Sequence, residues 1–357
     1  MAGRRTTERM PVDVADPARL RDALTLLDEA HTVDLHTDTF IATRMAGYDA
    51  AAEHRPRHRH FVGHVDLPRA RRGGLKGALW SITTNPFRPA SSRQRTLLRN
   101  LQALRTFACT TPGAAWVTTA AAFDDAMAQR QHAIIPVVQG ANCLGDADSF
   151  ASVGATDIVA ATLVHLLSSA LAETSTPLPM KRLWGPRGLT ARGRALVGTM
   201  NAERVLIDLA HASVDTFWDT IGLHDHSQPL TVTHTGLAGV HPHWRNIDDA
   251  QLKAIADTGG TVGVIFHPGF LGPEAAAHDG IGLVMRHLAH IIDTVGEDHA
   301  SLGSDWDGFI VPPDSLKDPL GLPLLVAEMQ SRGYRSERIH KILGGNFVRC
   351  LRALRPG

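Results

Sequence analysis

The chain has 357 residues, and its 36 Lys and Arg residues balance its 36 Asp and Glu residues, so the formal net charge is zero with His neutral. This balance excludes a generic nucleic-acid-binding protein, which would carry a basic excess, and we expect no nucleic-acid partner. With 43% apolar and 20% charged residues, the composition also excludes a charged, disordered chain. The 20 His residues stand out beside only 2 Tyr, because His is the most common metal ligand in proteins.

The cysteines and the N-terminus indicate the cellular compartment. Cys109, Cys143 and Cys350 are widely spaced and odd in number, so they predict neither a disulfide framework nor a Cys-type zinc site. The N-terminal segment is basic but is not followed by the apolar run of a signal peptide, and no apolar run is long enough to span a bilayer. We therefore expect a soluble, cytoplasmic protein without membrane association, in which residues 1–15 form a disordered tail.

Eight short apolar runs alternate along the chain with segments long enough to form helices. In chain order they are Val33–Leu35, Ala78–Ile82, Ala133–Val138, Ile158–Val164, Val205–Leu209, Pro229–Thr233, Thr261–Phe266 and Ala300–Gly303. Runs of this length and composition are typical of strands that are buried on both faces, as in a parallel sheet. Helical patterns lie between them at Arg93–Phe107, Asp248–Asp257 and Leu283–Val295, and glycines follow the last two closely.

Eight strands that alternate with helices predict an α/β fold of the (β/α)₈ TIM-barrel type, and the chain length is suitable for one. We expect a single domain over residues 1–357, with extra helices at the N- and C-terminal ends. An open, doubly wound sheet is the alternative. The basic segment His54–His60 has no carboxylate pair nearby and is predicted to be a solvated loop.

Polar residues, most of them able to bind a metal, directly follow seven of the eight predicted strands. In chain order they are His36 and Asp38, Gln139, His165, His211, His234, His267 and Asp305. In a barrel, the C-terminal ends of the strands converge on one mouth, where enzymes of this fold have their active sites. The placement therefore favours the barrel and predicts that these side chains meet.

The residue types at the strand ends indicate metal-assisted hydrolysis. His36 and Asp38 are two residues apart, so both can point into the mouth, and His211 and His234 end consecutive strands. Imidazole nitrogens and a carboxylate are the ligands expected for Zn²⁺ or a similar metal. Such a metal lowers the pKa of a bound water to about 7. Asp305, in the sequence GSDWDG, could take the proton of that water and pass it to a leaving amine.

The chain also resembles the membrane (renal) dipeptidase family of zinc peptidases, which have amidohydrolase-type barrels. The matching segments are VDLHTD at Val33–Asp38, HVDLPRARRGGLKGALWS at His64–Ser81, GLTARGRALVGTMN at Gly188–Asn201, LIDLAHAS at Leu206–Ser213, VTHTG at Val232–Gly236, HWRNIDDAQLKAIADTGGTVGV at His243–Val264, LGSDWDG at Leu302–Gly308 and ILGGNF at Ile342–Phe347. This ordered set covers nearly the whole chain and is far more specific than the HxD pattern alone. The resemblance implies a binuclear zinc site that hydrolyses dipeptides, often with D-configured C-terminal residues, and it suggests a homodimer.

The resemblance further implies that His36 and Asp38 bind one zinc ion, and His211 and His234 the other. The family has a Glu after its third strand, where the carboxylate bridges both metals, but this sequence has Gln139 at that position. An amide offers one neutral oxygen and an NH₂ group that only donates, whereas a carboxylate offers negative charge and two oxygens. We therefore expect one or two zinc ions, with at least one of the two sites weakened.

The remaining roles that the resemblance implies concern the substrate. His165 would stabilise the developing oxyanion or orient the substrate, and Asp305 would be the general acid and base. Arg245, in the segment HWRN, would hold the C-terminal carboxylate of a dipeptide-like substrate, a task that suits its bidentate guanidinium. The loop from Leu166 to Gly185 departs from the family pattern, in which an Asn and a Trp-containing loop follow the His, so the substrate can differ from a standard dipeptide.

Three functions therefore compete. The first is a metal-dependent dipeptidase or a close amide hydrolase with a weakened or single metal site. The second is an amide hydrolase specialised for a conjugated metabolite in a biosynthetic pathway, and the altered loop is the observation that supports it. The third is an inactive barrel that binds a ligand or a partner protein, for which Gln139 is the direct support; the retained ligands and Asp305 argue against it.

Overall fold

The computed structural model describes residues 17–55, 61–85, 87–144, 157–177, 186–273 and 280–357. The expected N-terminal tail lies outside the described residues, as do positions 56–60 of the basic His-rich segment. In the described part of the chain, no helix combines the length and the hydropathy that a membrane-spanning segment needs. The three cysteines are free thiols.

The centre of the fold is one sheet of parallel strands. The strands are β1 (Val33–Thr37), β2 (Gly77–Thr83), β3 (Ala114–Trp116), β4 (His132–Gln139), β5 (Ala160–Thr162), β6 (Leu206–Asp208), β7 (Thr231–Thr235), β8 (Thr261–Val264) and β9 (Ala300–Leu302). Eight of them follow the order β1-β2-β4-β5-β6-β7-β8-β9, and β3 pairs with β4 outside this path. The segment after β9 reaches back to β1, because the Asp38 N–H donates to the Trp306 carbonyl at 2.8 Å and the Asp305 N–H to the His36 carbonyl at 3.1 Å. The eight strands thus form a nearly closed barrel, which confirms the predicted fold.

Each of the eight predicted strands overlaps an observed one. β3 was not predicted, because its three residues, Ala114–Trp116, include no β-branched side chain of the kind that marks a strand. It extends the sheet beside the N-terminal half of β4, where Ala114 pairs with His132. β3 pairs only with the first residues of β4, so it lies away from the C-terminal strand ends that form the barrel mouth.

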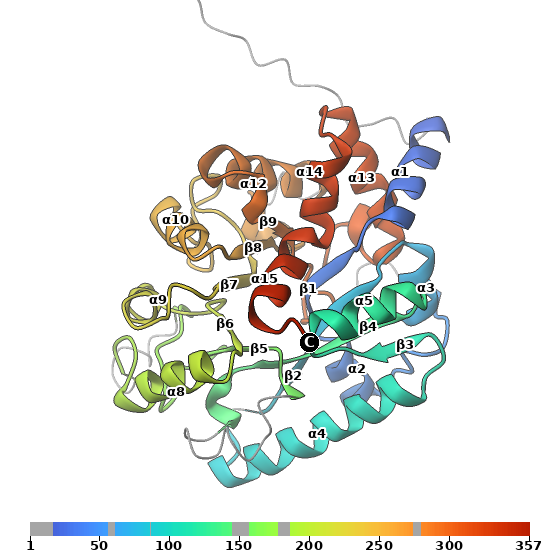
Figure 1. The fold of residues 1–357 in the computed structure, drawn as a ribbon. Helices are drawn as coiled ribbons and strands as arrows, with labels where there is room; N and C mark the ends of the chain where they lie inside the picture. The colour runs from blue at the N-terminus through green and yellow to red at the C-terminus, as the bar shows by residue number, and fades with distance from the viewer. Residues whose placement is uncertain (1–16, 56–60, 86, 145–156, 178–185, 274–279) are drawn as a thin grey trace, which may run out of the picture.

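Helices surround the barrel (Figure 1). The α-helices are α1 (Pro17–Glu29), α2 (Thr39–Ala46), α3 (Leu67–Arg72), α4 (Ala90–Thr110), α5 (Ala120–Ala128), α8 (Ala191–Ala202), α9 (Val214–Ile221), α10 (Asp249–Asp257), α11 (Pro268–Leu271), α12 (Gly280–Val295), α13 (Leu322–Ser331), α14 (Ser336–His340) and α15 (Asn346–Leu354). The predicted helical segments fall in α4, α10 and α12. Helices from both ends of the chain cover the barrel, since α1 packs against α13, and the expected terminal helices are present.

Helix α10 shows how the sequence sets an element boundary. The Asp248 side chain accepts a hydrogen bond from the Gln251 N–H at 2.8 Å, and the Gln251 side chain accepts one from the Asp248 N–H at 3.0 Å. This reciprocal capping box satisfies two backbone donors that the first turn of a helix leaves free. The start of α10 fixes in turn the end of the long loop that follows β7.

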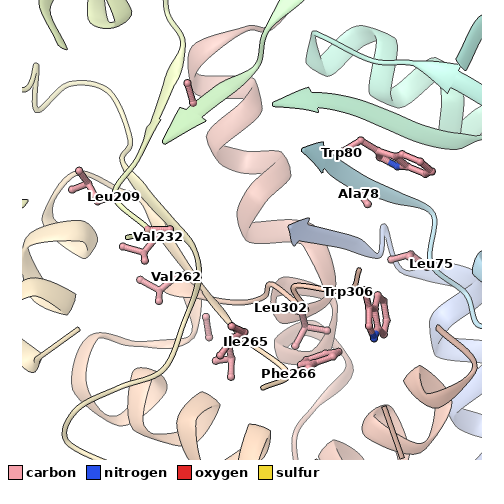
Figure 2. Close-up of a cluster of buried hydrophobic side chains, with 14 of the residues drawn as sticks. Leu75, Ala78, Trp80, Leu209, Val232, Val262, Ile265, Phe266, Leu302 and Trp306 are labelled. Carbon is pink, nitrogen blue, oxygen red and sulfur yellow. The ribbon is translucent and has the colours of Figure 1, made fainter. Parts of the chain in front are cut away.

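The core consists of two buried clusters. The larger packs the barrel strands against the outer helices, and the second joins Leu35, Leu79 and Ile135 of the strands to α5 and α15. Figure 2 shows part of the larger cluster: Val232 of β7 and Val262 of β8 lie near each other, and Leu302 of β9 lies beside Phe266 and Trp306. The rings of Phe266 and Trp306 meet edge to face, with their centroids 5.4 Å apart. Such apolar contacts on the outer faces of the strands hold the strand ends in place, and polar residues follow at the mouth.

Two glycines allow the backbone to approach closely at the top of the barrel. A Cβ atom on Gly263 would lie 2.0 Å from the carbonyl oxygen of Thr233, and one on Gly303 would lie 1.8 Å from the same oxygen. Both distances are far below van der Waals contact, so neither position can carry a side chain without moving β7. The glycines therefore help to position His234, the next residue of β7.

Candidate active site

The structure brings the polar strand-end residues together at the barrel mouth. The Nε2 atom of His36 lies 3.6 Å from Oδ1 of Asp38 and 3.8 Å from Oδ1 of Asp305. The rings of His36 and His234 stack with their centroids 3.9 Å apart. One candidate ligand atom from each of His36, His234 and Asp305 lies within 4.8 Å of the others. Residues from β1, β7 and the loop after β9 thus form a compact group that could hold a metal ion.

His211, Gln139 and His165 lie next to this group. The Nε2 atom of His211 is 3.0 Å from Nε2 of His234 and 3.5 Å from Nε2 of Gln139. The ring of His165 meets that of His211 edge to face, with centroids 4.6 Å apart. The strand-end residue His267 does not join them: it caps α11 by accepting from the Gly269 N–H, and its ring stacks on Phe270 at 4.5 Å.

The unpaired nitrogen and oxygen atoms at the centre of this group are suited to bind a cation. His36 Nε2 and Asp38 Oδ1 are buried and have no hydrogen-bond partner in the described structure. Buried polar atoms are almost always hydrogen-bonded, so unpaired ones need a partner that protein groups do not supply. An imidazole nitrogen and a carboxylate oxygen are both lone-pair donors to Zn²⁺. The residues present therefore fit a metal.

A chain of hydrogen bonds fixes the orientation of the His234 ring. The Thr233 hydroxyl donates to Oδ2 of Asp208 at 2.6 Å, and Nδ1 of His234 lies 2.8 Å from the same hydroxyl oxygen. Because the hydroxyl hydrogen is used on Asp208, the oxygen must accept the hydrogen of His234 Nδ1. The lone pair of His234 is therefore on Nε2, which faces the site, as a metal ligand requires.

The bend after β9 holds Asp305 in a sparsely populated conformation. Asp305 has φ of 61° and Asp307 φ of 67°, in the left-handed region that non-glycine residues seldom adopt. The bend is anchored on both sides. Asp34 of β1 accepts hydrogen bonds from the N–H and the hydroxyl of Ser304, and Asp307 accepts one from the Thr39 hydroxyl at 2.6 Å. Strain that is held in this way is typical of functional sites.

Burial strongly changes the protonation of the site. It raises the pKa of Asp305 to about 8, against the opposing effect of His36. It lowers the pKa of His165 to about 4, and it places the pKa values of His211 and His234 well below their ordinary value. These imidazoles are therefore neutral near pH 7, which leaves their lone pairs available. For His36, attraction to Asp38 and Asp305 outweighs burial and raises the pKa.

Arg245 enters the site from the loop between β7 and α10. Its side chain is buried, with 4% of the residue exposed, and Nη2 donates to the His234 carbonyl at 2.8 Å. Its Nε has no hydrogen-bond partner in the described structure. Burial lowers the pKa of the guanidinium to about 10, so it stays charged at neutral pH. A buried cation with a free donor is suited to an anionic ligand such as a carboxylate.

Sequence reasoning missed the residues that orient the predicted ones. Gln139 Oε1 accepts hydrogen bonds from the hydroxyls of Thr83 at 2.7 Å and Ser81 at 3.5 Å, so its NH₂ group faces His211. Ser81 and Thr83 lie on β2, and Asp208 and Thr233 on β6 and β7. The sequence signal that could have identified them is a polar side chain within a buried strand. Burying a polar group costs free energy unless it has a hydrogen-bond partner.

Comparison with known proteins gives a family and related folds. The family model for membrane dipeptidases (peptidase family M19) matches residues 20–355. A curated Klebsiella pneumoniae protein, described as an uncharacterized protein in the pqqA 5′ region, is 41% identical over 170 residues, which are 47% of this chain and 61% of that protein. Dipeptidase tcpJ of Claviceps purpurea is 30% identical over 194 residues, which are 54% of this chain and 43% of that protein. The chain thus covers less than two thirds of the length of these two relatives.

Solved structures match over more of their length. Dipeptidase AC, a metallopeptidase, has a TM-score of 0.79 at 28% identity, covering 92% of this chain and 99% of that chain. A Rhodobacter sphaeroides metallopeptidase liganded with a phosphinate mimic of the dipeptide L-Ala-D-Ala has a TM-score of 0.78 at 27% identity, covering 91% and 99%. The probable dipeptidase PvdM of Pseudomonas aeruginosa, at 19% identity and a TM-score of 0.83, covers 95% and 99% and shows the same fold.

Proposed function

Because this chain belongs to the membrane dipeptidase family, we propose that it is a metal-dependent hydrolase that cleaves the amide bond of a dipeptide or dipeptide-like substrate. The observation that carries the proposal is the group of His36, His234 and Asp305, whose candidate ligand atoms lie within 4.8 Å of one another at the barrel mouth. The unpaired Nε2 of His36 and Oδ1 of Asp38 at the same place support it.

In this proposal, each site residue has one task. His36, Asp38, His211 and His234 would hold Zn²⁺, which when bound lowers the pKa of water and polarises a carbonyl. Asp305 takes a proton from the attacking water and transfers it to the leaving amine nitrogen, which needs a carboxyl group that changes protonation near neutral pH. Its Oδ1 atom lies 3.8 Å from Nε2 of His36, beside the proposed metal position.

The substrate is held by the two groups beside the reacting centre. Arg245 binds the C-terminal carboxylate through its free Nε–H, with the guanidinium plane fixed by the bond to the His234 carbonyl. His165, neutral because burial lowers its pKa to about 4, orients the scissile carbonyl or stabilises the charge that develops on its oxygen. Fixed donors of this kind lower the activation barrier because they need no reorganisation.

We further propose that the metal position nearest Gln139 and His211 is weakly occupied. Gln139 Oε1 is engaged by the Thr83 hydroxyl at 2.7 Å, and its NH₂ side faces Nε2 of His211 at 3.5 Å. An amide hydrogen cannot bind a cation, and the neutral side chain does not offset the charge of two ions. One strongly bound zinc ion is the expected stoichiometry.

The direct test is an assay of purified protein on a panel of L,L- and L,D-dipeptides with added Zn²⁺, Mn²⁺ or Co²⁺. We expect turnover with at least one metal, and loss of most of it in Asp305→Asn, with the unfolding transition retained. Absence of turnover with every metal and every dipeptide would contradict the proposal. Turnover of an N-acyl amino acid in place of dipeptides would favour the specialised amide hydrolase. The altered loop after His165 supports that alternative.

A further inference from the structure

Large apolar side chains are exposed in several segments that follow barrel strands in the sequence. They include Met45, Phe61, Phe87, Leu166, Trp244 and Phe309. Their exposed fractions range from 42% for Trp244 to 83% for Phe87. Exposed apolar surface that borders a buried polar site is typical of ligand binding.

Trp244 differs from the others because it belongs to a packed group of rings. This aromatic cluster consists of His243, Trp244, His267 and Phe270. The Phe270 ring stacks on His243 at a centroid distance of 4.4 Å and on His267 at 4.5 Å. Trp244 meets Phe270 edge to face at 6.1 Å and lies 5.1 Å from His243. The cluster joins the loop after β7 to the loop after β8.

Hydrogen bonds under the rings hold these two loops together. The Asn246 side chain donates to the Phe270 carbonyl at 2.7 Å and to the His241 carbonyl at 2.8 Å, and it accepts from the Gly236 N–H at 3.0 Å. All the hydrogen-bonding groups of this amide are thus used. The cluster therefore presents a preformed surface rather than a loop that must be ordered by the ligand.

The aromatic cluster is continuous with the buried cation of the site. Arg245 follows Trp244 directly, and its N–H donates to Nδ1 of His243 at 3.2 Å. Its guanidinium lies over the end of β7, bonded to the His234 carbonyl. Arg245 and the rings therefore lie on the same side of the barrel, in the segments that follow β7 and β8.

We infer that the aromatic cluster is the subsite for the side chain of the C-terminal residue of the substrate, and that it selects an aromatic or large apolar side chain. This inference rests on the proposed function, which supplies the carboxylate on Arg245. The partly exposed Trp244 forms the contact surface, and Phe270, stacked between His243 and His267, supports it. An aromatic side chain packs well against another ring in offset or edge-to-face geometry, and it also provides a large apolar contact area.

The test is equilibrium binding of two phosphinate dipeptide mimics that share an N-terminal Ala and end in Phe or in Ala. Binding is measured by calorimetry on the zinc-loaded protein, so that turnover is not needed. We expect the mimic ending in Phe to bind about tenfold more tightly, as partial burial of one ring provides. Trp244→Ala should remove this preference and leave the affinity for the mimic ending in Ala within about twofold, whereas Trp244→Phe should keep most of it.

The matched control is Phe87→Ala. Phe87 is another exposed aromatic residue, but it follows β2, which lies across the barrel from β7 in the strand order. This variant should keep the preference. Equal binding of both mimics, or a preference that Trp244→Ala leaves intact, would overturn the subsite without affecting the proposed function. Binding of neither mimic would overturn both. If Trp244→Ala changed the molar mass of the protein in solution and left the preference between the mimics unchanged, the cluster would instead be a contact between copies of the chain.

Discussion

Gln139 is the residue on which the metal content of the site depends. It ends β4 with a neutral amide whose oxygen is held by Thr83 at 2.7 Å. A carboxylate in its place would still accept that hydrogen bond, and its second oxygen would face Nε2 of His211, where the NH₂ group now lies. Gln in place of Glu at this position thus removes a negative charge from the site and leaves the hydrogen bond to Thr83 possible.

We therefore expect Gln139→Glu to raise the zinc content of the dialysed protein from about one ion per chain toward two. The added negative charge offsets the repulsion between two cations and provides a second oxygen ligand. Elemental analysis of both proteins measures the change. The control is Gln139→Met, which has a similar length and no charge and should gain no zinc. Equal zinc in the wild type and in Gln139→Glu would contradict the proposed effect of the amide.

At the scale of elements, β6 and β7 act together to prepare a ligand. Asp208 ends β6, and its carboxylate accepts from both the N–H of Thr233 at 3.0 Å and its hydroxyl at 2.6 Å. The hydroxyl oxygen then accepts from His234. Thr233→Val keeps the shape of the side chain and removes this link.

We expect Thr233→Val to weaken zinc affinity by about 10- to 100-fold, the usual cost of losing a group that orients a metal-bound His. Competition with a chromogenic chelator measures the dissociation constant. Thr233→Ser retains the hydroxyl and should restore most of the affinity, which separates this role from packing. A zinc affinity that is the same in all three proteins would show that the hydroxyl does not orient His234.

The same strands show what can be predicted from the sequence. The alternation of apolar runs and helices predicted the barrel, and the barrel alone brings His36 of β1 close to Asp305 after β9, because strand order is a property of the fold class. The hydroxyls of Thr83 and Thr233 could not be assigned, because the groups to which they donate, on Gln139 and Asp208, belong to other strands of the barrel. His267 shows the limit of the strand-end rule: it follows β8 but turns toward Phe270, away from the metal-competent group.

At the scale of the whole molecule, the packing of β7, β8 and the end of β9 depends on close backbone approach. Gly303→Ala would place a Cβ atom 1.8 Å from the Thr233 carbonyl oxygen, so β7 and the segment after β9 must separate. We expect a loss of about 1–3 kcal/mol in the free energy of unfolding, as in overpacked cores, measured by urea denaturation. Gly198→Ala is the control: Gly198 lies in α8 with nothing within 4 Å of its added Cβ, and the change should stabilise slightly. Equal effects of the two changes would contradict the requirement for glycine at position 303.

Acid stability of the whole fold depends on a His at the opposite end of the barrel from the mouth. His132 begins β4, and Nε2 accepts from Trp80 Nε1 at 3.3 Å, while Nδ1 donates to the Leu75 carbonyl at 3.1 Å. This arrangement uses the neutral ring, and burial lowers its pKa to about 4. An exposed His in the unfolded chain has a pKa of about 6.5.

The unfolded chain therefore binds a proton at His132 before the folded chain does. The contribution of this residue to stability is complete above pH 6.5, is lost as the pH falls from 6.5 to about 4, and does not change further below that. The shift corresponds to a loss of roughly 3 kcal/mol. In His132→Gln the amide can also accept from Trp80 and donate to Leu75 but does not titrate, so the free energy of unfolding should fall less steeply between pH 6.5 and 4. Denaturant melts of both proteins at pH 7, 5.5 and 4.5 measure the two slopes. Equal slopes would contradict this role, because they would mean that folding does not lower the pKa of His132.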